Sequence, residues 1–207
     1  MALRDWQAAL GQLVEARSSG REQGPVLNQL GGLALSAEER DWLRGVTDTP
    51  GFALTAEVPR WWRHVRVRRS ARLTQLALRE NMDAVVSDYL RAVPCFSLFF
   101  IAEGLAFLEY VAHTVTLPHV RPVAELERAI WVLKLAVAQP TKAPEGAEAE
   151  AARKHPAAGA QILFQAPPQA VLAALLSGAP LPELEPRHYP VEVAPDIPGF
   201  WRLATPA

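Results

Sequence analysis

The residues that could perform chemistry in this 207-residue chain are few and scattered. Glu103 and Glu109 interrupt an otherwise apolar segment, and two carboxylates in such a place can act as a general acid and base. Neither a nucleophile nor a set of metal ligands accompanies them. We therefore interpret them as partners for arginines elsewhere in the chain, and we predict no catalytic residue.

The histidines and the cysteine do not have the spacing of a metal or redox site. His113 and His119 are the closest pair of histidines, and their six-residue separation does not place two ligands on one helix face. Cys95 is the single cysteine, which excludes an internal disulfide, and no histidine stands out as its base. No glycine-rich phosphate loop, GxSxG or HExxH motif occurs. We predict no metal and no cofactor in this chain.

The most unusual stretch spans residues 59–79, with seven arginines, two adjacent tryptophans and no acidic residue. Pro59 suits the first turn of a helix, because that turn leaves its N–H groups without helical partners anyway. At about 100° per residue, one side of this helix carries the large apolar side chains Trp62, Val65, Leu73 and Leu76. Arg69 lies in the middle of that side and Arg72 at its edge.

A guanidinium group on an apolar helix face must be paired if it is buried, because an unpaired buried charge is costly. We predict that Arg69 or Arg72 pairs with Glu103 or Glu109. Two interpretations of the whole helix remain open. One is a solvated arginine face with a structural ion pair, and the other is a docking surface.

Composition indicates a globular protein, with 50% apolar and 21% charged residues. The net charge of −1 argues against a dedicated nucleic-acid binder, whose domain is usually basic as a whole. The first residues, MALRDWQAALGQL, contain acidic and polar side chains where a signal peptide needs an apolar core. No uninterrupted apolar segment reaches the roughly 18 residues of a membrane span. We expect a soluble, cytoplasmic protein that binds no membrane.

Helical periodicity dominates the first two thirds of the chain. Ser36 and Glu39 form a capping box that opens a short helix, which we expect to end at Pro50 and Gly51. Other helices are predicted over residues 3–16, 82–93, 96–113 and 123–137. Residues 139–159 contain three prolines and no large apolar side chain, which is typical of a linker.

The last part of the chain predicts a small sheet. Strands are expected over residues 160–165, 189–194 and 199–203, with one helix over 167–178. The predicted fold is α+β: a mostly helical N-terminal domain (1–138), a linker (139–159), and a small C-terminal antiparallel sheet with one helix (160–207). Pro190 indicates that its strand lies at an edge of the sheet or has its backbone N position on the free side, and a free edge can accept an extended peptide as an added strand.

The order of these features resembles a family, the MbnC/TglI-like partner proteins of multinuclear non-haem iron-dependent oxidases. Those oxidases modify ribosomally made peptides, and some relatives of the partners were once catalogued as DNA-binding proteins. The resemblance is carried by the segments LSAEERDWL (35–43), PGFALTAEVPRWWRHVRVRRSARLT (50–74), SLFFIAEGLAFLEYV (97–111), PHVRPVAELERAI (118–130) and PVEVAPDIPGFWRL (190–203). They cover most of the chain except the linker.

The resemblance implies a non-catalytic subunit. In such a pair the oxidase is expected to hold the iron, and its partner to recruit the leader of the precursor peptide, partly by strand addition. The residues that suit docking on the oxidase or peptide are Arg60, Trp61, Arg63 and Arg66, since Trp and Arg often anchor interfaces. The residues expected at the peptide-binding sheet edge are Val191, Glu192, Val193, Phe200 and Trp201.

Two alternatives belong to other classes of protein. A DNA-binding transcription regulator would place the arginine-rich helix in a groove, where phosphate contacts supply affinity. The predicted arginines surround that helix instead of lining one face, so nucleic acid is not the expected partner. An enzyme would need a pocket with perturbed acids, for which Glu103 and Glu109 are the candidates.

Overall fold

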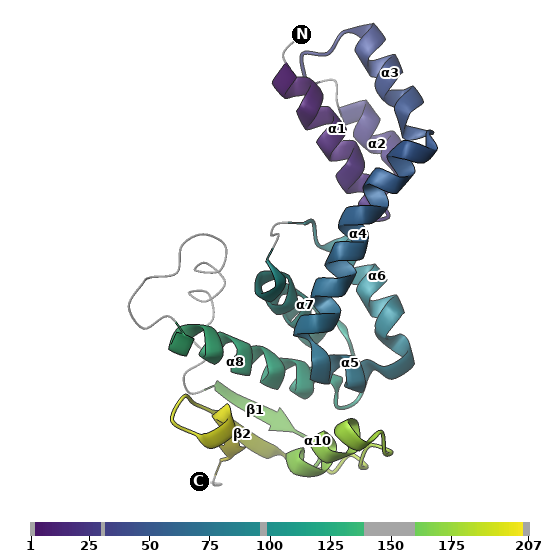
Figure 1. Cartoon of the computed structure of the whole chain (residues 1–207). Coiled ribbons are helices and arrows are strands. Elements are labelled where there is room, and N and C mark those ends of the chain that lie inside the picture. Colours follow the sequence, from purple (N-terminus) through teal and green to yellow (C-terminus); the bar gives the residue numbers. More distant parts are fainter. Residues whose placement is uncertain (1–2, 30–31, 96–98, 139–159, 205–207) are drawn as a thin grey trace. The chain divides into compact units, whose positions relative to one another are not determined.

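The structure is a computed structural model that describes residues 3–29, 32–95, 99–138 and 160–204 (Figure 1). A mostly helical N-terminal region precedes a three-stranded antiparallel sheet with one helix, which confirms the predicted fold class. The chain forms two compact units, here called the first unit (Met1–Val65 and Ser87–Phe96) and the second unit (Arg66–Val86 and Ser97–Ala207). These bounds differ from the predicted division at residue 138, and the predicted linker lies outside the described residues.

The first unit is built around the helices α1 (Leu3–Ser18), α2 (Gln23–Gln29) and α3 (Ala37–Thr47). These helices surround a hydrophobic cluster of the buried residues Ala9, Leu13, Leu35, Leu43 and Phe52. The predicted capping box opens α3: the Glu39 backbone N–H donates to Ser36 Oγ at 3.1 Å, and the Ser36 N–H donates to Glu39 Oε2 at 2.7 Å. This local prediction is confirmed.

The helix that carries the arginines, α4 (Pro50–Ser70), begins nine residues earlier than predicted. Thr49 caps it, because Thr49 Oγ1 accepts the Phe52 N–H at 3.2 Å, and Pro50 occupies the first turn. Pro59 lies inside the helix and removes one backbone hydrogen bond there. The expectation that the helix opened by the capping box ends before Pro50 is confirmed, because α3 ends at Thr47. The expectation that Pro59 begins the arginine helix is wrong.

The predicted apolar side of this helix is also wrong. Ala71 leaves the helical region with φ −111° and ψ 55°, and a separate helix, α5 (Arg72–Leu78), follows it. Residues on either side of Ala71 therefore share no continuous face. Trp62 and Leu76, expected inside, are 42% and 40% exposed. The residues of α4 that are buried are Phe52, Ala56, Arg63, Arg66, Val67 and Ser70.

In the second unit, α7 (Phe100–Thr114) packs against α8 (Val120–Ala138). The helix α5 packs on α8 and on α10 (Pro168–Ser177), and η2 (Arg79–Asn81) connects α5 to α6 (Met82–Ala92). The α6 helix contributes its first residues to the second unit and its last ones to the first. Among the described helices, none is long and apolar enough to cross a membrane.

The sheet consists of β1 (Ala160–Phe164), β2 (Tyr189–Val193) and β3 (Trp201–Leu203), in the order β1-β2-β3. Of the two alternatives for Pro190, the edge strand is wrong, because β2 is central. Pro190 is tolerated because its backbone faces the β3 side at the end of the ladder, where its carbonyl accepts the Ala204 N–H at 2.9 Å. The missing N–H therefore removes one hydrogen bond at the end of the sheet and none in its middle.

One face of the sheet is covered by α8 (Figure 1). The side chains of β1 and β2 that are buried are Ile162, Phe164, Val191 and Val193. On the opposite face, Arg202 Nη2 pairs with Glu192 Oε2 at 2.9 Å. The alternation of apolar and polar side chains along β2 matches this one-sided burial.

Candidate functional site

Arg63, predicted to dock a partner, is 2% exposed. Its Nη2 donates to the Val93 carbonyl at 2.9 Å and its Nη1 to the Leu90 carbonyl at 3.5 Å, and its guanidinium lies 5.3 Å from the centre of the Tyr89 ring. Carbonyls at a helix C-terminus lack helical partners and carry the negative end of the helix dipole. Arg63 therefore stabilises the end of α6, and its assignment to a docking surface is wrong.

Arg66 is buried as well. Its Nη1 lies 3.8 Å from Glu103 Oε2, with side-chain exposures of 9% and 0%. The predicted buried ion pair thus exists with a different arginine, and Arg66 is unsuitable as a docking residue. Glu109 pairs with Arg128 at 3.8 Å.

Arg69 and Arg72 do not fill the structural role predicted for them. Both are exposed, and the guanidinium of Arg69 lies 5.6 Å from the centre of the Phe100 ring. The prediction for Arg69 and Arg72 is wrong because it assumed that one helical face continues through Ala71, where the helix ends. Glu103 lies beside Arg66 and Glu109 beside Arg128, so each acid belongs to a separate ion pair between helices.

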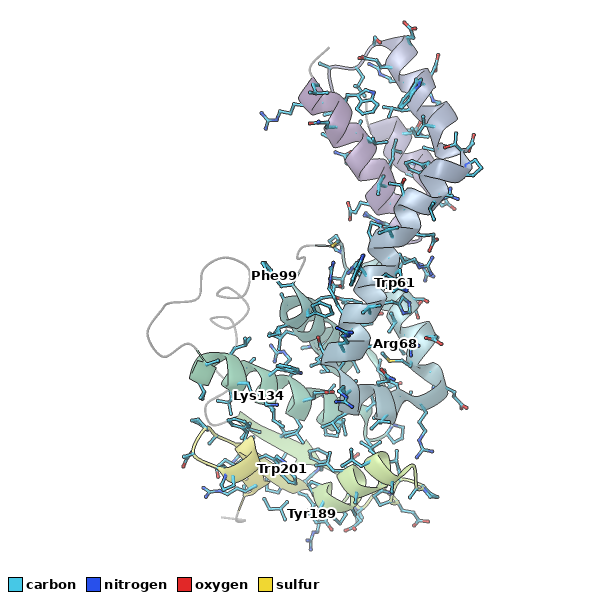
Figure 2. The ribbon with its side chains drawn as sticks, in the orientation of Figure 1. Trp61, Arg68, Phe99, Lys134, Tyr189 and Trp201 are labelled. Carbon is cyan, nitrogen blue, oxygen red and sulfur yellow. The ribbon has the colours of Figure 1, made fainter. Side chains whose placement is uncertain are left out.

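A first candidate surface lies on the exposed side of α4 in the first unit. It consists of the large apolar side chains Leu54, Val58, Trp61 and Trp62, which are 69%, 50%, 58% and 42% exposed. We call these residues the α4 stripe. Steps of three and four residues place them along one side of the helix. The Trp61 and Trp62 rings meet edge to face at 4.8 Å, and Figure 2 shows Trp61 on this helix.

Of the four predicted docking residues, two thus remain accessible. Trp61 belongs to the α4 stripe, and Arg60 beside it is half-buried. The other two, Arg63 and Arg66, are internal.

A second candidate surface is a cavity of about 740 Å³ in the second unit. Its walls come from the end of α4 and from α5, α8, α10 and η3 (Pro198–Phe200). The side chains that define its character are Arg68, Arg72, Ile130, Trp131, Lys134 and Phe200. We call it the basic groove.

The cations of the basic groove differ in how they are paired. Arg68 Nη2 donates to Asp83 Oδ1 at 2.5 Å, and Lys134 Nζ lies 5.3 Å from the centre of the Trp131 ring. Within the described part of the chain, no carboxylate forms an ion pair with Arg72 or Lys134. Figure 2 shows Arg68 near the end of α4 and Lys134 on α8.

Glu127, a residue that the sequence analysis missed, lies at the wall of this groove. Its Oε1 accepts the Leu73 N–H at 3.0 Å, and its Oε2 accepts the Thr74 N–H and hydroxyl at 2.8 Å each. Ala71 offers no side-chain acceptor, so Glu127 caps α5 from another helix. Burial raises the pKa of the Glu127 carboxyl and outweighs these hydrogen bonds. The sequence does contain a sign of this role. Glu127 follows Val123 by four residues and precedes Ile130 by three, which places its acid on the apolar side of α8.

The third candidate feature is the outer edge of β3, which pairs with no other strand among the described residues. The register pairs Arg202 with Glu192. Along an antiparallel ladder, residues that hydrogen-bond to the neighbouring strand alternate with residues whose backbone groups point the other way. The N–H and C=O groups of Trp201 and Leu203 consequently point away from β2. Trp201 thus lies at an edge as predicted, whereas Val191, Glu192 and Val193 are in the central strand and are not at an edge.

Phe200 lies just outside β3, in η3, and borders the basic groove. The opposite edge of the sheet is partly covered, because the Gln165 carbonyl at the end of β1 accepts the Glu185 N–H at 2.6 Å. Among the described residues, the β3 edge is therefore the more open one, and it begins directly after Phe200 at the groove.

The described residues contain no group of three or more His, Cys, Asp or Glu side chains arranged to hold a metal ion. His113 Nδ1 contacts the Glu109 carbonyl at 2.7 Å and His119 Nε2 contacts the Pro182 carbonyl at 3.0 Å. Cys95 is exposed.

Comparison with protein-family models, with curated proteins and with solved structures yields no match to this chain. The family resemblance of the sequence segments therefore stays a prediction.

Proposed function

We propose that this chain is the non-catalytic partner of a multinuclear non-haem iron-dependent oxidase. It binds the leader of a ribosomally made precursor peptide and presents it to the oxidase, which carries the iron. The two proteins form a heterodimer in the cytoplasm. The observation that supports this proposal most directly is the outer edge of β3, which no described strand occupies and which adjoins a groove in the same unit.

Strand addition needs a row of backbone groups that no neighbouring strand occupies. Trp201 and Leu203 supply such groups on the outer side of β3. Main-chain pairing tolerates many sequences, and alternate side chains of the added strand supply selection. A leader held in this way leaves the rest of the precursor available to the active site of another protein.

The α4 stripe is the proposed contact with the oxidase. Soluble proteins seldom expose large contiguous apolar patches outside binding sites, and tryptophan is the residue type most enriched at energetically dominant interface positions. The stripe belongs to the first unit, and the β3 edge belongs to the second. One surface can therefore engage the oxidase while the other holds the peptide.

The alternative of a DNA-binding regulator has weaker support. Arg63 and Arg66 are buried and Arg68 is paired with Asp83. These three side chains are thus occupied within the protein instead of forming a row for phosphate contacts.

The proposal is tested by co-expressing the full chain with the iron oxidase and precursor peptide that we expect to be encoded beside it. Leu203→Pro removes the outward N–H while keeping the bonds between β3 and β2, because proline is tolerated at such an edge position. We expect the modified fraction of the precursor, measured by mass spectrometry, to fall about tenfold. Leu203→Ala is the matched control, since it shortens the side chain and keeps the N–H. Full modification with Leu203→Pro would exclude β3 as the peptide site.

A further inference from the structure

We infer that the basic groove binds an acidic segment of the same peptide that adds to β3. The inference rests on the proposed function and specifies its substrate class: an extended peptide in which Glu or Asp residues flank an apolar one. Charge, shape and continuity with β3 each support it.

The charge of the groove is positive. Arg68, Arg72 and Lys134 contribute cations, and Glu127 contributes the single carboxyl group among its described lining residues. Both Glu127 oxygens accept hydrogen bonds from the start of α5, so they are not presented to a ligand. Asp83 already offsets Arg68. Arg72 and Lys134 are left to attract carboxylates, which form shorter and stronger hydrogen bonds with such donors than neutral groups do.

The apolar part of the groove is held rigidly. Trp131 Nε1 donates to the Ser70 carbonyl at 2.7 Å, which fixes the indole on α8. Phe200 has a φ of +69°, a conformation that costs a non-glycine residue free energy. Two backbone bonds hold it there: its N–H to the Ile197 carbonyl at 2.8 Å, and its carbonyl to the Ala194 N–H at 3.0 Å. An apolar side chain of the peptide would pack between these two rings.

The groove is continuous with the strand edge. Phe200 immediately precedes Trp201, and a strand advances about 3.3 Å per residue. A peptide that pairs with β3 and continues past Phe200 would reach the groove within about two residues. A volume of about 740 Å³ falls within the usual range of ligand pockets and accommodates a few side chains.

The test uses fluorescein-labelled decapeptides and the full chain. All peptides share a Thr-Val-Thr-Val-Thr half for strand pairing, and the other half carries a phenylalanine between two glutamates, two glutamines or two lysines. Each peptide is made in two versions, with the variable half at the N-terminal or the C-terminal end, because an added strand can run parallel or antiparallel to β3. Fluorescence anisotropy gives the affinities at two salt concentrations.

We expect the glutamate peptide to bind about tenfold more tightly than the glutamine peptide, with the difference reduced at high salt. The double variant Arg72→Gln with Lys134→Gln should remove that difference. Both residues are exposed, so the variant is expected to fold normally. The matched control, Arg121→Gln with Arg187→Gln, neutralises two exposed cations outside the groove and should retain the difference.

The outcomes separate this inference from the proposed function. Equal binding of the glutamate and glutamine peptides, with both weakened by Leu203→Pro, would overturn the groove inference and leave strand addition intact. A glutamate preference that depends on Arg72 and Lys134 but is insensitive to Leu203→Pro would support the groove and overturn pairing with β3. If no peptide binds at millimolar concentration, both are overturned. A labelled single-stranded DNA decamer that binds more tightly than the glutamate peptide would assign the groove to nucleic acid and overturn the inference.

Discussion

At the residue scale, the buried charged side chains are satisfied in three different ways. Arg63 donates to carbonyls at the end of α6, and Arg66 lies beside Glu103. Glu127 accepts hydrogen bonds from the start of α5. Each arrangement joins two helices, so these residues orient elements and are not available to a ligand. Removing one partner leaves the other buried, which is more costly than never burying the pair.

The Arg66–Glu103 pair leads to a comparison of two arginines on α4. Arg66→Met should lower the free energy of unfolding by roughly 3 kcal/mol, because it removes the cation that lies 3.8 Å from the fully buried Glu103 carboxylate. Arg69→Met should change it by less than about 0.5 kcal/mol, because Arg69 is exposed. Urea unfolding of the two variants gives both values. A loss for Arg66→Met that is as small as the loss expected for Arg69→Met would contradict the pairing of Arg66 with Glu103.

Glu127 predicts a pH dependence of stability. Burial raises the pKa of its carboxyl above the ordinary value of about 4.5. The folded protein thus binds this proton more tightly than the unfolded chain does. The stability that this group contributes is fully present below about pH 4.5 and is lost as the pH rises through the folded pKa.

Thermal unfolding between about pH 4 and pH 8 tests this expectation. Glu127→Gln cannot ionise, so the wild-type Tm should fall relative to that of the variant as the pH rises. Parallel curves for wild type and Glu127→Gln would contradict the raised pKa.

At the scale of elements, α4 has two chemically different sides. Its buried side satisfies arginines internally, whereas its exposed side carries the apolar α4 stripe. The helix also continues through Pro59, at the loss of one backbone hydrogen bond. This continuity places Leu54 and Val58 on the same helix as the two tryptophans, which makes the stripe longer than one that began at Pro59.

The stripe predicts how the chain binds its oxidase. Trp61→Ser combined with Trp62→Ser should weaken the complex by roughly a hundredfold, since a buried tryptophan anchor is commonly worth about 2 kcal/mol or more. Isothermal titration calorimetry with the purified oxidase measures the change. Trp42→Ser is the matched control, because Trp42 is an exposed tryptophan on α3, outside the stripe. An unchanged Kd for the double variant would remove α4 from the interface.

At the scale of the whole molecule, the C-terminal sheet belongs to the same compact unit as several of the helices. It packs on α8, and α10 packs on α5, within the second unit. One hydrophobic cluster of the first unit, in contrast, is formed by residues between Ala9 and Phe52. The two units therefore depend on the C-terminal residues to different degrees.

Truncation after residue 159 is expected to affect the two units unequally. It removes four buried apolar side chains of the sheet, each worth roughly 1.5–3 kcal/mol, and exposes part of α8. We expect α5 and α8 to lose protection in hydrogen exchange while α1 and α3 keep it. Unchanged protection in α8 would show that the helices of the second unit fold without the sheet. Leu203→Pro is thus a cleaner test of peptide binding than the truncation.

The sequence alone determined the features that depend on near neighbours. The capping box at Ser36 and Glu39 opens α3 as predicted, and Gly178 ends α10 with a φ of 73° in the left-handed region. The change from helical periodicity to short alternating strands correctly predicted the α+β class. In each case the deciding interactions lie within a few residues of one another, so the local pattern contains them.

Only the tertiary structure decided which arginine faces which acid and which strand lies at the edge of the sheet. Arg66 meets Glu103 because a bend at Ala71 ends the helical face on which Arg69 and Arg72 were placed. The proline in β2 favoured an edge position for that strand. The strand is nevertheless central, because β3 is short and the missing N–H of Pro190 lies at the end of the β2–β3 ladder. Such outcomes depend on contacts between residues far apart in the chain, and these contacts choose among local conformations that the sequence leaves nearly equal in free energy.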